Sequence, residues 1–336
     1  MERRVTLKTI AECVGVHVST VSLALRDHHR ISVEMRKKIQ DLAVEMGYRP
    51  DPSMRALCAY RHAVQPREVQ SGLAYLTNFD SSVPYQRLVR DNARRRAEEL
   101  GYNLIEYNLL KQDISLERLK SIWWSQGLRG IIVGPFRNQT KLELTLDQWP
   151  VVAVGHSVQE PNFNRVTTHH LQNMLTHLEE LHSRGYRRVG LCLPTNLDER
   201  TGGQIHAAYL LDSKMAGLES PPPVFSKWPA LDGIAEWIQQ HRIEAVIGHV
   251  DHYKALLALG FVIPKQIGFS VLTISRDQQE WADLAGFDEM TEELSANMVD
   301  FLVSLIHEQA KGVLNPQRFF LVSGNFRDGT SLRPKC

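Results

Sequence analysis

Features of exported or membrane-embedded proteins are scarce in this 336-residue sequence. The four cysteines, Cys13, Cys58, Cys192 and Cys336, have the spacing of neither a disulfide framework nor a metal site. Cys13 and Cys192 are expected in the core. No apolar run approaches the roughly 20 residues of a membrane helix, and Met1 is not followed by the apolar segment of a signal peptide. These absences predict a protein of the reducing cytoplasm.

Motifs of common enzyme classes are also missing. Gly202 and Gly203 follow Arg200, but the residues around them are not those of a phosphate-binding loop. No Ser-His-Asp set or cysteine nucleophile can be assigned. The adjacent His169 and His170 belong to no zinc-ligand spacing. We therefore predict no enzymatic activity, no cofactor and no metal ion.

Residues 5–48 have the pattern of three short helices arranged as a helix-turn-helix unit. Gly15 and Gly47 end the first and third helices, and Ser32 is the expected N-cap of the third. In such a unit the second helix enters a major groove of DNA. Any three-helix segment with a glycine turn could give this pattern, so the spacing alone leaves both interpretations open. The residues expected to face inward are Leu7, Ile10, Ala11, Val14, Val21, Ala24, Leu25, Ile39, Leu42 and Met46.

A fourth, shorter helix is expected after Tyr48. Asp51 is suited to the N-cap and Pro52 to the first helical position. Only about two turns fit before the next domain, and a helix of that length is marginal in water. We therefore expect this hinge helix to form only against a partner.

Residues 5–57 resemble the DNA-binding headpiece and hinge of the LacI/GalR family of bacterial transcription regulators. The resemblance rests on the opening VTLKTIA, on Thr20-Val21-Ser22, and on the tail from Gly47 to Leu57, in this order and spacing. It implies that a homodimer binds a near-palindromic operator in double-stranded DNA, with Leu57 wedged into the minor groove. The implied DNA contacts are Thr6, Leu7, His17, Val18, Ser19, Thr20, Ser22, Leu23, Arg26, Arg30, Ser32, Met54, Arg55 and Leu57.

The second helix departs from the usual chemistry of the family. Many relatives carry arginine at the position of Leu23 and serine at that of His17. Leucine and valine pack against a thymine methyl group but cannot pair with a guanine edge. We therefore expect thymine in the operator opposite Val18 and Leu23. Whether Met54 also enters the minor groove is left open.

Charge agrees with this assignment. Residues 1–67 hold twelve Lys and Arg against seven Asp and Glu, a net +5; the whole chain is +1, so the remainder is −4. A basic end on a slightly acidic body places phosphate attraction at the headpiece. A solvated basic surface would give the same count, so charge alone does not decide.

From about residue 71 apolar strands alternate with helices, a pattern typical of parallel sheets covered on both faces. Helix–Gly–Tyr–strand patterns near residues 101 and 185 suggest two similar halves. The expected fold is an all-α helix-turn-helix headpiece plus an α/β body of two doubly wound parallel-sheet subdomains, like periplasmic binding proteins. The expected strands are 72–78, 103–107, 130–134, 150–155, 187–193 and 244–250, with 267–272; expected helices are 85–100 and 168–183, with others starting at residues 115, 199 and 231.

The expected domain bounds are residues 1–49 for the headpiece, 50–62 for the hinge helix and linker, and 63–336 for the body. Within the body, the N-subdomain takes about 70–165 plus about 293–322. The C-subdomain takes about 166–292 plus about 323–332. The chain ends without a leucine heptad, so the tetramer-forming tail of some relatives is not expected.

The family places a small-molecule effector between the two subdomains, outside the carboxyl ends of the strands. Arg200 matches a family arginine that holds polar ligand groups, and Trp228 lies where a relative stacks an aromatic ring on a sugar. Two acidic ligand contacts of relatives are replaced here by Gly155 and Thr273, which puts an identical sugar in doubt. The candidate effector contacts are Asn78, Asp80, Tyr85, His156, Arg200, Trp228, Asp251 and Thr273.

The sequence therefore predicts a transcription regulator, a repressor in the first instance, whose operator affinity depends on a carbohydrate or related metabolite. It would be cytoplasmic, and associated with the nucleoid when bound to DNA. A solute-binding protein or an enzyme on the same body fold is the alternative, disfavoured by the headpiece. Activation instead of repression, and whether the effector releases or promotes DNA binding, stay open.

Overall fold

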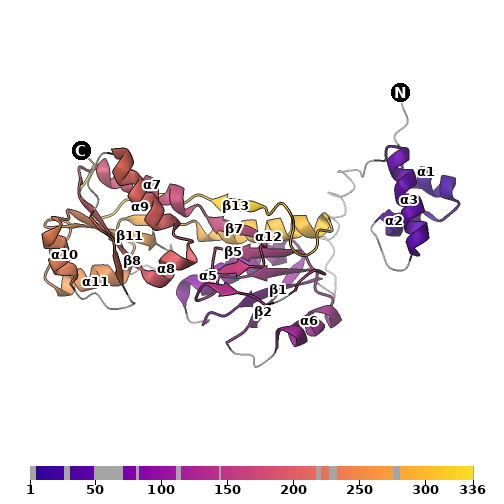
Figure 1. Ribbon diagram of the computed structural model, residues 1–336, viewed down its shortest axis with the longest axis horizontal. Helices are drawn as coiled ribbons and strands as arrows, with labels where there is room; N and C mark the ends of the chain where they lie inside the picture. Colours follow the sequence, from indigo (N-terminus) through magenta and orange to yellow (C-terminus); the bar gives the residue numbers. More distant parts are fainter. Residues whose placement is uncertain are drawn as a thin grey trace. The chain divides into compact units, whose positions relative to one another are not determined.

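Figure 1 shows a computed structural model of the chain. The structure describes residues 5–25, 31–48, 71–80, 83–110, 115–143, 145–216, 221–226, 233–274 and 281–335, without the side chains of Ser19, Ser22, Leu23, Ala216 and Ser226. The chain divides into two compact units, Met1–Glu68 (the headpiece) and Val69–Cys336 (the body). The expected domain bounds at residues 49–50 and 62–63 lie outside the described residues and stay predictions.

Three helices make up the described part of the headpiece: α1 (Leu7–Val14), α2 (Val18–Leu25) and α3 (Val33–Glu45). Thr6 and Thr9 form a reciprocal capping box at the start of α1, and the Ser32 hydroxyl accepts a hydrogen bond from the Met35 N–H at the start of α3. Gly15 ends α1 at φ +74°, a left-handed conformation that glycine adopts without strain. The predicted helix ends at Gly15 and Gly47 and the predicted N-cap Ser32 are confirmed.

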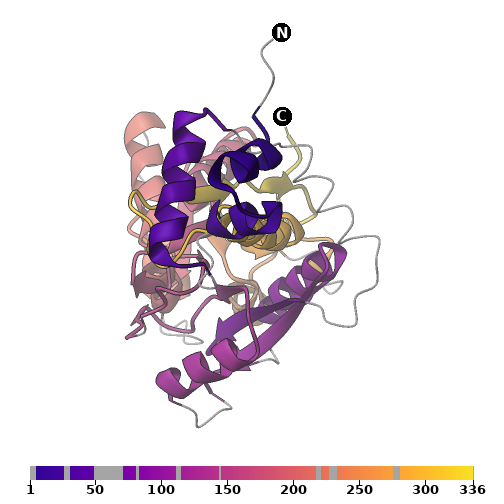
Figure 2. The ribbon, with the colours of Figure 1, turned by 90° about the vertical axis from the view of Figure 1, so that its right-hand side faces the viewer.

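The headpiece encloses its own small apolar core. The three helices lie against one another (Figure 1, Figure 2), and Ile10, Val21, Ala24 and Ile39 are fully buried in the core that they form. Leu7, Val14, Leu25, Leu42 and Met46 pack around that core and are partly buried. Cys13, expected in the core, is exposed. It follows Glu12 on the outer side of α1, away from the face that carries Ile10.

The body contains two lobes, each built on a six-stranded sheet. All neighbouring strands in both sheets are parallel except β12 and β14. In spatial order the N lobe has β13 (Phe319–Val322), β7 (Asn164–Thr168), β5 (Val151–Val154), β3 (Gly130–Val133), β1 (Ser71–Thr77) and β2 (Tyr102–Asn108). The C lobe has β14 (Asn325–Arg327), β12 (Gly286–Asp288), β11 (Gly268–Ile274), β10 (Ala245–Gly248), β8 (Val189–Pro194) and β9 (Val224–Ser226). The short strands β4 (Thr140–Lys141) and β6 (Val158–Glu160) form a separate two-stranded sheet in the N lobe.

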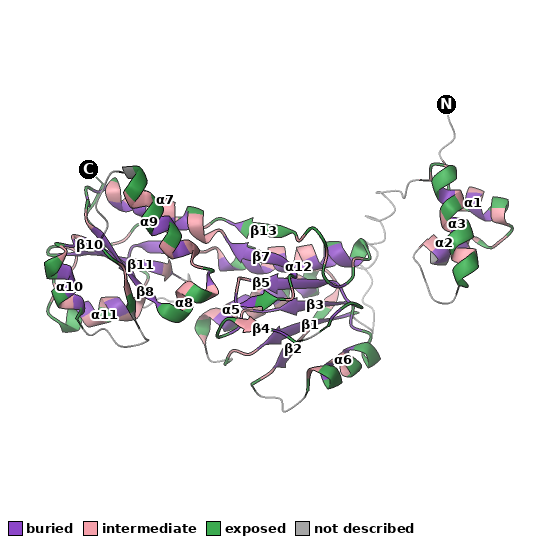
Figure 3. Cartoon of the chain, viewed as in Figure 1, coloured by how far each residue is buried: buried purple, intermediate pink, exposed green. Residues whose placement is uncertain are grey.

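Helices cover both faces of each sheet, so the central strands are buried, whereas the edge strand β13 is largely exposed (Figure 3). In the N lobe, α5 (Pro84–Glu99) and α12 (Thr291–His307) cover one face and α6 (Leu116–Ser125) the other. In the C lobe, α7 (His170–His182) and α9 (Gln204–Ala216) lie opposite α10 (Ile234–Gln240) and α11 (Val250–Ala258). The short α8 (Thr195–Arg200) follows β8. The predicted pair of doubly wound parallel sheets is confirmed.

The described chain passes between the lobes at three places. The first lies between β7 and α7, the second between β12 and α12, and the third between β13 and β14. As a result, α12 and β13 belong to the N lobe although they follow every C-lobe strand except β14 in sequence. We call these segments the three crossovers.

Three expectations about the body need correction. The helix expected from residue 199 is instead two helices, because α8 ends at Arg200 and Gly202 and Gly203 turn the chain at φ +66° and +70° before α9. The strand expected over 244–250 ends at Gly248, since His249 caps α11. The Gly–Tyr patterns precede non-equivalent strands, β2 and β8, because Gly101 and Gly185 share only the left-handed turn after a helix. The two halves are similar in strand order, not through that pattern.

No helix in the described part of the chain is both long and apolar enough to span a bilayer.

Candidate functional site

Two separate surfaces carry the candidate functional residues, one on the headpiece and one between the lobes of the body. On the headpiece, α2 follows α1 after the turn at Gly15 and packs its Val21 and Ala24 inward. His17 precedes α2 and is exposed, and its carbonyl accepts the N–H groups of Thr20 and Val21 at 2.9 and 3.3 Å. The first turn of α2 is therefore well ordered and open on its outer side.

Helix N-termini lie at three of the predicted DNA-contacting positions. Thr6 caps α1, His17 leads into α2, and Ser32 caps α3. Free backbone N–H groups and the helix dipole make such ends suitable for phosphate oxygens. Leu7, Val18 and Thr20 are half-buried, so only part of each side chain can reach DNA.

The remaining predicted DNA contacts are described in part or not at all. Ser19, Ser22 and Leu23 lie on α2, but their side chains are outside the described residues. Arg26, Arg30, Met54, Arg55 and Leu57 lie outside the described residues entirely. Their roles stay predictions.

In the body, the two lobes touch at the carboxyl ends of their strands. The Gln139 side-chain amide donates to the Glu199 carbonyl at 2.8 Å, and the Gln204 Nε2 donates to the His156 Nε2 at 3.0 Å. The Arg200 guanidinium lies over the Phe79 ring, 5.5 Å from its centroid. These contacts join loops of the N lobe to α8 and the start of α9 in the C lobe. They place Arg200 in the interlobe region where an effector was expected.

Arg200 lies near side chains from different lobes, the Tyr85 phenol and the Glu289 carboxyl. Its Nε is buried and has no hydrogen-bond partner among the described residues. Burial lowers the pKa of Arg200, while the charge interactions with Tyr85 and Glu289 act in the opposite direction. The guanidinium remains cationic at neutral pH, since the ordinary pKa is far above 7.

Glu289 is the most perturbed acid of this region. Its side chain is 13% exposed, and burial raises its pKa from 4.5 to about 7 despite a 3.2 Å hydrogen bond from the Thr273 hydroxyl and the nearby Arg200 charge. Burial also raises the pKa of Tyr85, with the Glu289 charge adding to the effect. Near pH 7 the Glu289 carboxyl is therefore close to half protonated, and Tyr85 is neutral.

The two histidines of the region are neutral at pH 7. Burial lowers the pKa of His170 to about 3, and the neighbouring His156, His169 and Arg200 contribute further. Burial, followed by the Arg165 charge, lowers the pKa of His156 to about 4. Neutral His156 can accept the hydrogen bond from Gln204. The 3.8 Å contact between His170 Nδ1 and Glu289 is thus not a full ion pair at neutral pH.

The structure brings four of the predicted effector contacts, Tyr85, His156, Arg200 and Thr273, into this cluster. Asn78 instead joins the loop after β1 to the loop after β3, because its Oδ1 accepts a hydrogen bond from the Arg137 N–H at 2.8 Å. Asp80 is exposed after β1.

Asp251 does not join this cluster. It lies in the first turn of α11 and is 3.4 Å from His249 Nδ1. Trp228 lies outside the described residues.

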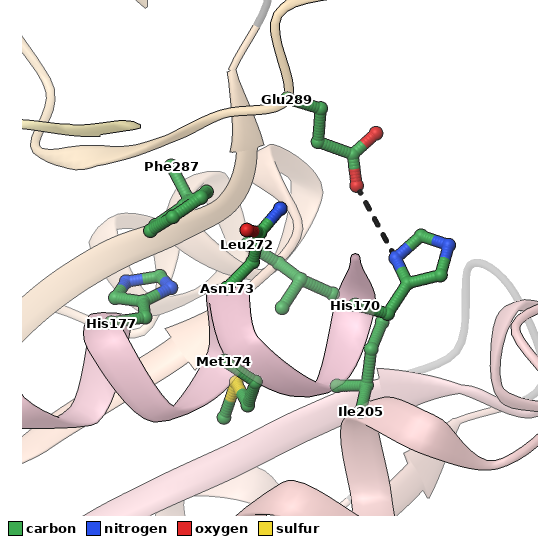
Figure 4. A pocket seen from close by; sticks show the side chains of 8 residues that line it. All are labelled: His170, Asn173, Met174, His177, Ile205, Leu272, Phe287 and Glu289. Carbon is green, nitrogen blue, oxygen red and sulfur yellow. Dashed lines mark ion pairs between the residues drawn. The ribbon is translucent and has the colours of Figure 1, made fainter. Parts of the chain in front are cut away.

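A small pocket, partly open to solvent and with room for about one water molecule, adjoins the cluster on the C-lobe side. Figure 4 shows Glu289 and His170 at one end and the Asn173 amide projecting from α7 between them and Phe287. Asn173 is buried, its Oδ1 accepts the Gly324 N–H at 3.0 Å, and its Nδ2 has no partner among the described residues. The other lining residues are Met174, His177, Ile205 and Leu272.

Sequence reasoning missed Glu289 and Asn173 and treated His170 only as a metal ligand to be discounted. Glu289 directly follows β12, which is three residues long and was not predicted. Its position just beyond the carboxyl end of a strand was the available signal. For Asn173 the available signal was its place in the helix expected over residues 168–183.

Residues 6–51 match the sequence model of the family described as "Bacterial regulatory proteins, lacI family". Over 102 residues, 30% of this chain, the sequence is 28% identical to HTH-type transcriptional regulator DegA of Bacillus subtilis (strain 168). The match spans 28% of that relative's length.

Solved structures match over 79% to 98% of the chain. The lac repressor dimer bound to operator and the anti-inducer ONPF has a TM-score of 0.59 at 17% identity, covering 98% of this chain and all of that one. The CelR–cellobiose complex gives the same values. A putative transcriptional regulator of the LacI family from Rhizobium etli has a TM-score of 0.64 at 16% identity, covering 79% of this chain and all of that one. At these identities the matches establish the fold.

Proposed function

We propose a sequence-specific DNA-binding activity for this chain, which carries the DNA-binding domain of the LacI family on a body with the fold of LacI-type regulators. A homodimer binds a near-palindromic operator in double-stranded DNA and represses transcription there. A small molecule bound between the lobes changes its operator affinity. The single observation that carries the proposal is the family match of residues 6–51, which coincides with the three-helix headpiece.

The headpiece supports DNA contact in two ways. The N-termini of α1 and α3, capped by Thr6 and Ser32, suit backbone phosphates, and the outer face of α2 suits base edges. Residues 1–67 also carry a net charge of +5, which favours phosphate binding and predicts a steep dependence on salt.

The interlobe cluster supports effector binding. Arg200 offers a guanidinium with a free, buried Nε, and Glu289, His156 and Tyr85 surround it with hydrogen-bonding groups. Two structural neighbours are complexes with cellobiose and with D-xylulofuranose. A carbohydrate or related polar metabolite is the class we propose for the cluster.

The hinge would couple the two sites. In this proposal the Leu57 side chain wedges into the minor groove only when two hinge helices pair, and the lobes set the spacing of those helices. Coupling of this kind is typically about 1–3 kcal/mol, a 5–150-fold change in operator affinity. Leu57→Ala should reduce specific affinity and DNA bending but leave salt-driven non-specific binding in place.

Selection from a random duplex pool tests the DNA part. The full chain should enrich a near-palindrome, and its affinity for that sequence should fall steeply between 50 and 200 mM salt, by roughly 10³–10⁵ for 6–10 phosphate contacts. A variant lacking residues 1–62 should lose this binding completely while keeping a cooperative melting transition of the body. Retained operator binding by that variant would overturn the proposal.

Arg200 provides the test of the effector part. Arg200→Ala should weaken the response of operator binding to the effector found in a metabolite screen, while DNA affinity without effector stays near that of the wild type. Arg137→Ala, an exposed arginine of the N lobe, serves as control. An unchanged response in Arg200→Ala would show that the effector does not bind at this cluster.

A further inference from the structure

One edge of the N-lobe sheet is open. Among the described strands, β13 pairs only with β7 and forms the outer edge of the sheet (Figure 1, Figure 3). The Arg318 and Val322 carbonyls accept backbone N–H groups from β7 and from the residue after it, each at 2.9 Å. Because alternate residues of a strand point their backbone groups to opposite sides, those of Phe319 and Leu321 point away from β7. They have no hydrogen-bond partner among the described residues, so they can pair with another strand.

The open edge is also apolar. Phe319, Phe320 and Leu321 are 52%, 44% and 47% exposed. Side chains alternate along a strand, so Phe319 and Leu321 lie on one face of the sheet and Phe320 on the face that carries Val322 and α12. Edge strands are commonly protected by a charge, a proline or a bulge, and β13 contains none of these. Apolar side chains on both faces of an open edge indicate a contact with another chain.

The β13 strand is complementary to a second copy of itself. If a twofold axis passes beside Phe320, the two strands run antiparallel, and Phe319 of each copy lies opposite Leu321 of the other. Each of these pairs exchanges two N–H···O bonds, which satisfies the outward backbone groups of both residues. On the other face, Phe320 lies opposite Phe320 of the second copy. A shift of the register by two residues would instead place Phe320 opposite Arg318, or Phe319 opposite Ser323.

We propose that the β13 edge is a contact between two copies of this chain, in which their N-lobe sheets join antiparallel across Phe320. The occupant is a second copy because the edge matches itself twice, in its backbone groups and in the apolar side chains that come to lie opposite one another. The strand has only four residues, so the contact is small and should form at high protein concentration.

Charged substitutions at the twofold axis test the proposal, by sedimentation velocity of the full-length protein without DNA. Phe320→Lys places two like charges directly opposite each other, as does Phe320→Glu, so each variant alone should lose the contact. Over a concentration series the wild type should reach at least twice the mass of either variant. An equimolar mixture of the two variants should recover this larger mass, because lysine then lies opposite glutamate.

Met215→Lys, which adds the same charge at a 75% exposed apolar position of α9, should keep the mass of the wild type. Recovery of the larger mass in the mixture would show that the single variants are folded and that position 320 faces itself. Equal masses of the wild type and both variants at every concentration would overturn the proposal. So would a mixture that keeps the mass of the single variants, as expected if a different protein occupies the edge.

The measurement is a ratio of masses, so it applies whether the unit that pairs is a single chain or a homodimer formed through another face. Phe320→Lys should also bind operator DNA as the wild type does, because the headpiece is unchanged. Failure of the β13 contact would therefore leave the operator-binding proposal intact, and the reverse also holds.

Discussion

The headpiece closes its core with residues from Ile10 to Ala43, whereas the main N-lobe core of the body joins Leu73 to Val322. Every contact in the headpiece core is made within one short stretch of chain. In the N lobe, α12 supplies a large part of the core and follows every C-lobe strand except β14. The headpiece is thus a local structure, and the body is held by contacts between distant segments.

This difference implies that the two units respond separately to substitution. The two units have separate apolar cores, and the boundary between them falls between Glu68 and Val69. A defect in one core should therefore leave the other folded. Small units also bury a smaller fraction of their surface, so the headpiece should be the weaker of the two.

Ile39→Ala should have the largest effect and break the headpiece alone. Ile39 is fully buried, and truncating a buried isoleucine costs about 2–5 kcal/mol, comparable to the whole stability of so small a unit. Calorimetry should show loss of the headpiece transition and an unchanged body transition. Val44→Ala, on the same helix at 82% exposure, should change neither. A shift of both transitions in Ile39→Ala would show that the units are coupled.

Glu289→Gln should alter the pH dependence of the body alone. The folded pKa of about 7 lies above the ordinary 4.5, so the native state binds the proton more tightly. The wild type, compared with the variant, should therefore lose stability as pH rises from about 4.5 to about 7. With about 1.4 kcal/mol per pKa unit, the difference is on the order of 3 kcal/mol. Denaturant unfolding of both proteins at several pH values measures it.

The stability of the wild type must be compared with that of Glu289→Gln at each pH, because buried histidines titrate in the same pH range. The lowered pKa values of His156, His170 and His177 give stability that is lost as pH falls, the opposite sign. Both proteins share those histidines. Glu293→Gln, the same substitution at an exposed site on α12, serves as the matched control. Parallel curves for Glu289→Gln and wild type would contradict the assignment of a buried, protonated Glu289.

Thr6→Val should give the smallest effect, again in the headpiece. The substitution removes the hydroxyl that accepts the Thr9 N–H at 3.3 Å, and loss of an N-cap costs about 0.5–2 kcal/mol. The melting temperature of the headpiece should fall while that of the body does not change. Lys8→Ala, exposed in the first turn of α1, should leave both temperatures near wild type. An unaffected headpiece transition in Thr6→Val would show that the capping box adds little.

The same contrast explains what the sequence could predict. In the headpiece, Gly15 and Ser32 act on their own helices, so their signals can be read locally. In the body, the doubly wound fold followed from alternating strands and helices. The short β12 was not predicted, because a three-residue strand has no detectable periodicity. The split between α8 and α9 was not predicted either.

The candidate site divides along the same line. Arg200, Tyr85 and Thr273 could be placed by resemblance to a family and do lie in one cluster. Glu289 and Asn173 acquire their character only from burial and from contacts with distant residues such as Gly324. Neither property is encoded in the neighbouring sequence.

The late position of α12 and β13 also sets an order of events during synthesis. The headpiece core is complete once residue 48 has left the ribosome, whereas the N-lobe sheet lacks its edge strand until residue 322. At roughly 5–20 residues per second, about 14–55 s of translation separate these two points. Each nascent chain therefore carries a finished DNA-binding unit well before it has lobes that could restrain it.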